Sequence, residues 1–265
     1  MAGGAWRHRS RRAGARVSIR EEAARGFQRG ADAYERGRPG YPGEAVEWLC
    51  EQLRLGPGRT VLDVAAGTGK LTRELVRSGA TVVAVEPVPG MRTVLEQVVP
   101  DAHALSGTAE ALPVGDGTVD AVTVAQAFHW FDGPAAVAEF HRVLRPRGRF
   151  GLTWNRRLVD EPIHRAVREI IGPYHRDSPS HYRGEWRHAV GDGGLFITVG
   201  EIEVPFEQVL DVDEFIDRFT SISYIAALPD RERETVVKRI QAVAAGAAHP
   251  IRLGYTTEAY VFERV

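Results

Sequence analysis

The sequence predicts an α/β fold built on a doubly wound, mostly parallel sheet. Up to Asn155, short apolar runs alternate with segments of helical periodicity, and the connections between them are short. This alternation is typical of parallel sheets flanked by helices. The stretch VLDVAAGTGKLT, from Val61 to Thr72, is the strongest indication, because an apolar run passes through two glycines directly into an amphipathic segment. It predicts a strand, a tight turn and a helix, with glycine supplying the positive φ that the turn needs.

Local signals define each element up to Asn155. Two N-terminal helices are expected, at 21–34 and 41–53, because Pro39 and Pro42 forbid one continuous helix. The helix after the fourth strand begins at Asp132, whose side chain can cap it, and Pro146 with Gly148 stops it. Strands are expected at 60–65, 81–86, 103–106, 119–127 and 149–154.

After Asn155 the alternation becomes less regular. The pattern predicts a strand bent at Pro205 and a pair of helices broken at Leu228-Pro229, apolar on one face. The expected elements are a helix at 160–171, a loop at 172–188, a strand at 197–210, helices at 213–228 and 230–245, and a last strand at 252–264.

Composition limits the class of protein. The chain has 265 residues, of which 43% are hydrophobic and 26% charged, as in ordinary globular domains. No apolar stretch approaches the roughly 20 residues of a membrane span, and the single cysteine, Cys50, agrees with a reducing compartment. We therefore expect a cytoplasmic protein that does not enter the membrane.

The first twenty residues differ from the rest of the chain. They carry six arginines and no acidic residue, whereas the net charge of the whole chain is −1. A segment of this kind can bind nucleic acid or act as a transit peptide. Because it has few aromatic residues and no apolar core, we favour a disordered basic tail over 1–20 and expect no nucleic-acid partner.

The glycine turn predicts a pocket for a nucleoside. Glu86 ends the second apolar run, and a carboxylate at the tip of the neighbouring strand can accept hydrogen bonds from ribose hydroxyls. A P-loop is disfavoured because its required glycine and Ser/Thr positions are Val64 and Leu71. A dinucleotide fingerprint is disfavoured because its third glycine is Thr72.

Further motifs follow in order: GTAEALPV at 107–114, VDAVTVAQAFHWFD at 119–132 and VLRPRGRFGLTWN at 143–155. With the glycine turn and Glu86, they make the chain resemble the class I S-adenosylmethionine-dependent methyltransferases. RPGYP and AFHWFD resemble the small-molecule branch that contains trans-aconitate and ubiquinone- or menaquinone-type methyltransferases.

The resemblance implies a Rossmann-like methyltransferase fold. Its sheet would have seven strands with a terminal antiparallel strand, and helical additions would lie over the active site. The chain would be a single domain from 21 to 265. Within it, 21–55 would be N-terminal helices, 56–155 the cofactor-binding core, and 156–265 the substrate cover and last strands.

The expected cofactor is S-adenosyl-L-methionine, which leaves as S-adenosyl-L-homocysteine. Asp63 has an alternative role, since its carboxylate can instead accept backbone donors of the turn. Thr108 departs from the family, where many relatives carry an acid, and Glu110 could compensate. The expected cofactor residues are Asp63, Ala65, Gly67 and Gly69 at the methionine portion, Glu86 at the ribose, Pro87 and Met91 at the adenine face, Ala109 and Glu110 at the adenine edge, and Gln126 and Ala127 near the sulfonium.

His129 and Trp130 are expected to contact the methyl acceptor. His129 has a pKa suited to proton removal, although its HWF run could equally pack a helix onto the sheet. Tyr34, Arg38 and Arg156 are expected to bind the acceptor, since the planar fork of arginine suits carboxylates. Two alternatives stay open: Tyr34, Arg38 and Tyr41 could instead clamp the cofactor carboxylate, and Arg157 could take the place of Arg156. The histidines of the loop at 172–188 have no metal-ligand spacing, so we expect no metal.

The predicted function is methyl transfer to a small organic molecule, on oxygen, nitrogen or carbon, by in-line displacement at the sulfonium methyl. Two alternatives stay open: a non-catalytic protein that binds S-adenosylmethionine, and a methyltransferase acting on RNA or protein. We expect a monomer or a homodimer.

Overall fold

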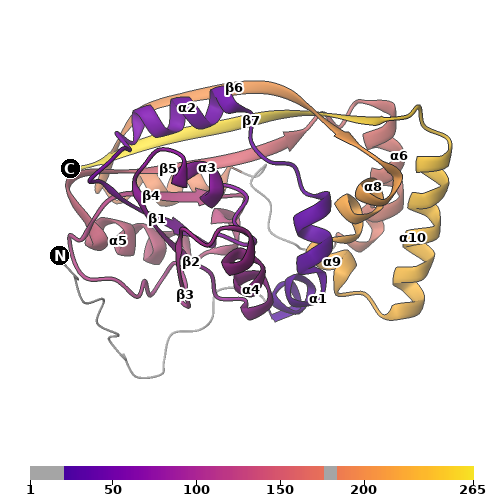
Figure 1. The fold of residues 1–265 in the computed structure, drawn as a ribbon, viewed down its shortest axis with the longest axis horizontal. Coiled ribbons are helices and arrows are strands. Elements are labelled where there is room, and N and C mark those ends of the chain that lie inside the picture. Colours follow the sequence, from indigo (N-terminus) through magenta and orange to yellow (C-terminus); the bar gives the residue numbers. More distant parts are fainter. Residues whose placement is uncertain (1–20, 176–183) are drawn as a thin grey trace.

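The computed structural model describes residues 21–175 and 184–265, so the expected basic tail at 1–20 lies outside the described residues. It contains a seven-stranded sheet of order β3-β2-β1-β4-β5-β7-β6 (Figure 1). β7 is antiparallel to both of its neighbours, and the remaining pairings are parallel. The strands are β1 Thr60–Val64, β2 Thr81–Val85, β3 His103–Leu105, β4 Val119–Ala125, β5 Leu144–Arg157, β6 Phe196–Leu210 and β7 Ile251–Arg264. The predicted fold class is confirmed.

β5 is longer than the sequence predicted, and the helix before it is shorter. Leu144 already pairs with Val119 of β4, so α5 (Gly133–Val143) ends before the expected stop at Pro146. The start of this helix is as predicted, because the Asp132 side chain accepts a hydrogen bond from the Ala135 N–H. The error arose because the end of α5 depends on pairing with β4, which is a tertiary contact.

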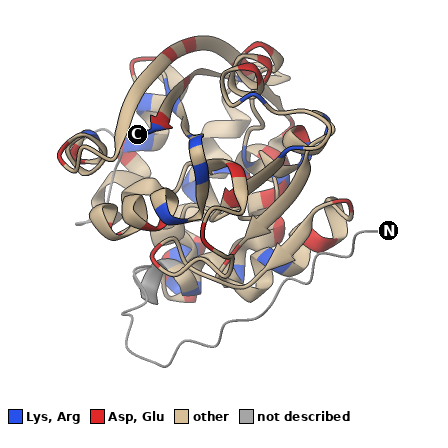
Figure 2. Cartoon of the chain, turned by 90° about the vertical axis from the view of Figure 1, so that its left-hand side faces the viewer, with Lys and Arg blue, Asp and Glu red and all other residues tan. Residues whose placement is uncertain are grey.

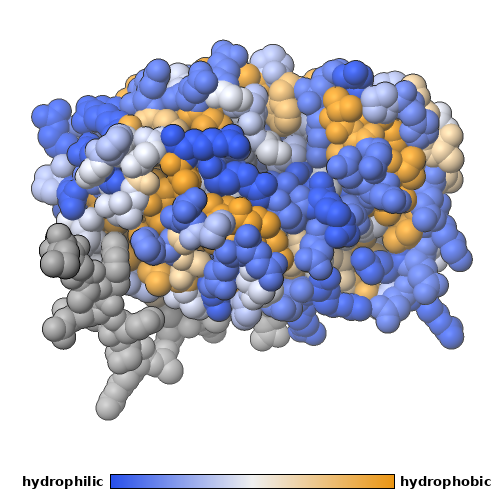
Figure 3. Space-filling model, viewed as in Figure 1, coloured by the Kyte–Doolittle hydropathy of each residue, from blue (hydrophilic) through white to orange (hydrophobic). Residues whose placement is uncertain are grey.

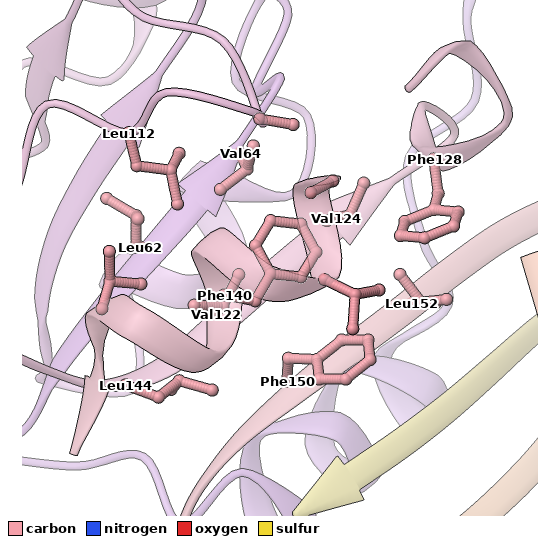
Figure 4. Packing of buried hydrophobic residues seen from close by; sticks show 14 of the residues in the cluster. Leu62, Val64, Leu112, Val122, Val124, Phe128, Phe140, Leu144, Phe150 and Leu152 are labelled. Atoms are coloured by element: carbon pink, nitrogen blue, oxygen red, sulfur yellow. The ribbon is translucent and has the colours of Figure 1, made fainter. Parts of the chain in front are cut away.

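Helices cover both faces of the sheet. The side chains of β1 alternate: Leu62 and Val64 belong to the cluster that includes α5, whereas Val61 belongs to the cluster formed by α2 and α3. Figure 4 shows the first cluster, in which Phe140 of α5 lies among side chains of β1, β4 and β5. The helices near the sheet are α2 Gly43–Gln52, α3 Thr72–Val76, α4 Pro89–Val98, α5 and α7 Glu185–Gly191.

A second group of helices closes one end of the sheet (Figure 1). Figure 1 shows the arrowhead of β5 pointing toward this group, so it lies at the carboxyl ends of the parallel strands. α1 contacts α8, α9 and also α4. The helices of the group are α1 Glu21–Gly37, α6 Pro162–Ile171, α8 Val212–Thr220, α9 Ser223–Ala226 and α10 Asp230–Ala245. Figure 3 shows hydrophobic residues at the surface in two areas, one at the left over the sheet and one at the right over this group.

Two expectations after Asn155 were wrong. The helix expected at 213–228 is divided into α8 and α9, because Ile222 is extended with φ −66 and ψ 128. The loop expected at 172–188 ends in α7, whose Trp186 and Val190 are buried against the sheet. Its segment 176–183 lies outside the described residues.

Candidate functional site

The glycine turn joins β1 to α3 and is held by Glu86, directly after β2. Gly67 has φ +60 and donates its N–H to Glu86 Oε2 at 2.8 Å. The other oxygen, Oε1, accepts the Val88 N–H at 2.8 Å. Burial raises the pKa of Glu86 from 4.5 to about 7, although both backbone hydrogen bonds oppose the shift. The carboxylate therefore lies buried beside the turn, with one backbone donor on each oxygen.

Asp63 ties three elements together beneath the turn. Its carboxylate accepts the hydroxyl of Thr72 on α3 at 2.6 Å and that of Thr123 on β4 at 2.9 Å. Burial raises its pKa from 3.8 to about 6. Each oxygen thus accepts one side-chain hydroxyl, whereas the alternative considered from sequence was that the carboxylate accepts backbone donors of the turn.

The two glycines of the turn have different surroundings. A Cβ added to Gly67 would meet nothing within 4 Å, so this position leaves open space beside the backbone. A Cβ on Gly69 would lie 2.8 Å from Cγ2 of Val99, and its φ is +88. Gly69 is therefore required by packing against Val99, directly after α4, and by the backbone conformation.

A cavity of about 60 Å³ lies beside the turn, and we name it the glycine-turn cavity. Ala65 and Gln126, which follow β1 and β4, line it with positive φ of 55 and 60. A non-glycine residue with positive φ strains the backbone by on the order of 1–3 kcal/mol, and such residues concentrate at functional sites. The residues that line the glycine-turn cavity are Phe27, Tyr34, Ala65, Gly67, Glu86, Val88, Met91, Ala125, Gln126, Ala127, Trp130 and Phe131.

Five of the residues expected at the cofactor do not line this cavity: Asp63, Gly69, Pro87, Ala109 and Glu110. Ala109 is buried in the cluster between the sheet and α5. Glu110 Oε1 accepts the Asp132 N–H at 2.9 Å, which joins its loop to the start of α5.

A second cavity, of about 230 Å³, lies between the sheet and the helices at its carboxyl end. We name it the arginine cavity after Arg38, Arg157 and Arg218. Four residues line both cavities, namely Phe27, Tyr34, Gln126 and Trp130, so the two adjoin. The remaining lining residues are Pro39, Tyr41, Lys70, His129, Asn155, His175, Ile222, Ser223 and Tyr224.

Of the residues expected to bind the acceptor, Tyr34, Arg38, His129 and Trp130 line this cavity and Arg156 does not. Arg156 Nε donates to Glu258 at 2.6 Å on the neighbouring strand β7. Successive side chains of a strand point to opposite faces, and it is Arg157 that lines the cavity.

Two cations of the cavity, Arg38 and Arg218, donate hydrogen bonds to neutral groups. Arg38 donates to Ser221 Oγ at 3.2 Å and to the Ser221 carbonyl at 3.3 Å, and it lies 4.9 Å from the Tyr34 ring centroid. Arg218 Nε donates to the hydroxyl of Tyr255 at 2.7 Å. Lys70 differs, since its Nζ lies 3.5 Å from a carboxylate oxygen of Glu35.

The sequence prediction missed Arg218 and Tyr224, which the helices α8 and α9 bring to the cavity. One signal was present: Arg218 shares the apolar face of α8 with Phe215 and Phe219, which are fully buried. A charged residue on the buried face of an amphipathic helix needs a polar partner or a function.

α1 closes over the glycine turn through Glu35. Its carboxylate accepts the Thr68 hydroxyl at 2.6 Å and an Arg73 N–H at 2.5 Å, and its carbonyl accepts from Lys70 at 2.5 Å. Since α1 also supplies Phe27 and Tyr34 to both cavities, these contacts fix one wall of the site.

The described residues 21–175 and 184–265 contain no group of three or more His, Cys, Asp or Glu arranged to hold a metal ion. No helix in the same part of the chain is both long enough and apolar enough to cross a membrane.

Comparisons with known proteins identify the family. Residues 62–152 match the family model described as a methyltransferase domain. An uncharacterized methyltransferase of Mycobacterium bovis is 42% identical over 233 residues, covering 87% of this chain and 89% of that protein. A demethylmenaquinone methyltransferase of Mycobacterium tuberculosis is 43% identical over 99 residues, covering 37% of this chain and 41% of that protein.

Solved structures share the fold. A protein assigned as a Type II methyltransferase from Anaeromyxobacter dehalogenans has a TM-score of 0.59 at 24% identity, covering 86% of this chain and 97% of that one. The extent of the sequence match, together with the sheet order and the glycine turn, shows that this chain belongs to the class I methyltransferase family.

Proposed function

We propose that the chain transfers a methyl group from S-adenosylmethionine to a small organic molecule. The observation that carries the proposal is the position of Glu86: its buried carboxylate lies beside Gly67, in a cavity that adjoins a second, larger one. Ligands of open α/β sheets bind at the carboxyl ends of the strands, and both cavities lie there.

The residues present fit an adenosyl cofactor. Each oxygen of Glu86 accepts one backbone N–H, and a carboxylate has acceptor capacity for about four hydrogen bonds, so two ribose hydroxyls could still be accepted. Val88 and Met91 offer an apolar surface for the adenine. Gly67 presents bare backbone, because no side chain shields it.

When bound, S-adenosylmethionine supplies a methyl group already activated on a sulfonium. The protein then needs only to orient the acceptor, exclude water and, for some acceptors, remove a proton. Phe27, Tyr34 and Trp130 form an aromatic boundary shared by the two cavities, which can exclude water where donor and acceptor meet. His129 lines the acceptor side and is the candidate to take a proton.

The size of the site favours a small acceptor over RNA or protein. A cavity of about 230 Å³ between the sheet and the helices is of a size that suits a metabolite. Along the ribbon of the described residues in Figure 2, Lys and Arg positions are interspersed with Asp and Glu positions rather than gathered into a basic stripe. A nucleic-acid enzyme would be expected to show such a stripe.

Calorimetry of the full chain with S-adenosylhomocysteine tests the donor. We expect saturable binding at one site, which Glu86→Ala weakens. Incubation of small-molecule extracts with methyl-labelled S-adenosylmethionine tests the transfer, and we expect label in a low-molecular-weight product. Absence of heat with the wild-type chain would overturn the proposal, as would label found only in protein or RNA.

A further inference from the structure

Among the described residues, the side chains that line the arginine cavity carry an excess of positive charge. Arg38, Lys70, Arg157 and Arg218 line it, and no Asp or Glu is among its described lining residues. Glu35 forms an ion pair with Lys70, whose Nζ lies 3.5 Å from its Oε1. The hydrogen bonds of Arg38 go to Ser221 and that of Arg218 goes to Tyr255, which are neutral.

Arg218 is the clearest case of a positive charge without an acidic partner among the described residues. The residue is 5% exposed, and its Nη1 is buried without a hydrogen-bond partner in the described part of the chain. Buried charges in proteins are normally paired, and a buried donor without an acceptor destabilises the fold. Arg218 therefore lines the cavity and carries a buried donor that no described group accepts.

The three arginines are close enough to repel one another. Burial, followed by the positive charges of Arg218 and Arg157, lowers the pKa of Arg38 to about 10. Arg38 is still protonated at neutral pH, so three positive charges converge on the same space. An anion placed among them would relieve the repulsion and accept charge-assisted hydrogen bonds.

We propose that the arginine cavity binds the methyl acceptor through an oxyanion group, a carboxylate or a phosphate, held by Arg157 and Arg218 with Arg38 beside them. This rests on the proposed function, because it assigns the chemistry of the acceptor for that reaction. Guanidinium groups match both oxyanions through paired N–H donors.

The two cavities suggest how such an acceptor is oriented. Arg157 and Arg218 line only the arginine cavity, whereas Gln126 and Trp130 line both. An acceptor whose anionic end is held by the two arginines would extend its remaining atoms toward the shared boundary. The cations thus position the acceptor and take no part in the chemical step.

The test is calorimetric titration of the full chain saturated with S-adenosylhomocysteine, which occupies any site for the cofactor's own carboxylate. The probes are succinate, citrate and inorganic diphosphate, with succinamide as the neutral match for succinate. We expect at least one anion to bind with a dissociation constant in the millimolar range or below, and succinamide not to bind. Tighter binding of succinate or citrate would indicate a carboxylate acceptor, and tighter binding of diphosphate would indicate a phosphate acceptor.

Variants assign the binding to the arginines. Arg218→Gln and Arg157→Gln should each weaken the anion about tenfold or more, as expected for a lost charge-assisted contact. Arg252→Gln is the matched control, because that exposed residue pairs with Glu207 on the surface. Arg157→Gln keeps the test decisive if removing the Arg218–Tyr255 contact unfolds the chain, which circular dichroism would show.

Two results would overturn the proposal. One is a wild-type chain that binds S-adenosylhomocysteine but none of the three anions. The other is a pair of arginine variants that bind the anion as well as the wild type does, or that lose S-adenosylhomocysteine instead. If S-adenosylhomocysteine itself gives no heat, the proposed function fails, and titration of the anions without it still tests the arginines.

Discussion

The Glu86 carboxylate accepts the backbone N–H of Gly67 at 2.8 Å, which ties the end of β2 to the glycine turn after β1. The same carboxylate shapes the turn and lines the cavity beside it. A group that is both structural and exposed to a ligand should affect stability and affinity together, and the two effects can be separated by experiment.

Replacing Glu86 by Gln should weaken binding of S-adenosylhomocysteine by about tenfold or more, because a hydrogen bond to a charged group contributes roughly 1.5–3 kcal/mol. Calorimetry at pH 8 measures the loss. Glu96→Gln, on the exposed side of α4, is the control and should bind as the wild type does. Equal affinities for the two variants would exclude Glu86 from the cofactor site.

Stability of the ligand-free chain should fall as pH rises from about 4.5 to about 7, the window given by the raised pKa of Glu86. Within this window the folded state binds more protons than the unfolded state, so the free energy of unfolding decreases with pH. Asp63, raised from 3.8 to about 6, contributes with the same sign.

Urea unfolding at several pH values measures this dependence, and Glu86→Gln should reduce its slope. A variant slope equal to that of the wild type would contradict the assignment. The affinity for S-adenosylhomocysteine should change in the opposite direction, rising from pH 6 to pH 8, because the ionised carboxylate is the better acceptor for ribose hydroxyls.

Asp63→Ala should destabilise the fold, because it leaves the hydroxyls of Thr72 and Thr123 without their buried acceptor. An unsatisfied buried group costs about 1–3 kcal/mol. Urea unfolding at pH 7 gives the loss. Asp101→Ala, an exposed carboxylate in the connection before β3, should leave the midpoint almost unchanged.

His129→Asn should lower turnover by about two orders of magnitude if His129 accepts a proton from the acceptor. Binding of S-adenosylhomocysteine should stay as in the wild type, since His129 lines only the arginine cavity. Unchanged turnover combined with a lower melting temperature would instead assign His129 to packing, which was the alternative considered from sequence.

Glu35→Gln should loosen α1 over the glycine turn, because it weakens the contacts with Arg73 and Lys70. We expect faster dissociation of S-adenosylhomocysteine, measured by stopped-flow competition, and faster proteolysis within α1. Glu44→Gln on the exposed side of α2 is the control. Equal dissociation rates for the two variants would show that α1 does not retain the ligand.

Much of the core could be predicted because its signals are local. The run from Val61 to Thr72 contains its own strand, turn and helix start, and Asp132 caps α5 through a residue three positions away. Parallel strands then bring Glu86 to Gly67, since the carboxyl ends of neighbouring strands meet at one edge.

The remaining features depend on contacts between distant parts of the chain. Because Leu144 pairs with Val119, α5 ends earlier than its sequence indicates. Arg157 lines the cavity and Arg156 does not, because successive side chains of β5 point to opposite faces. Packing of α8 and α9 against α1 carried Arg218 to the cavity that contains Arg38, across 180 positions of sequence.

Periodicity and turn chemistry act within a few residues, so the sequence pattern defined the elements and the cofactor edge. The group of cations that faces the acceptor was decided by tertiary packing, because charge on a helix acquires its partners only when the helices assemble.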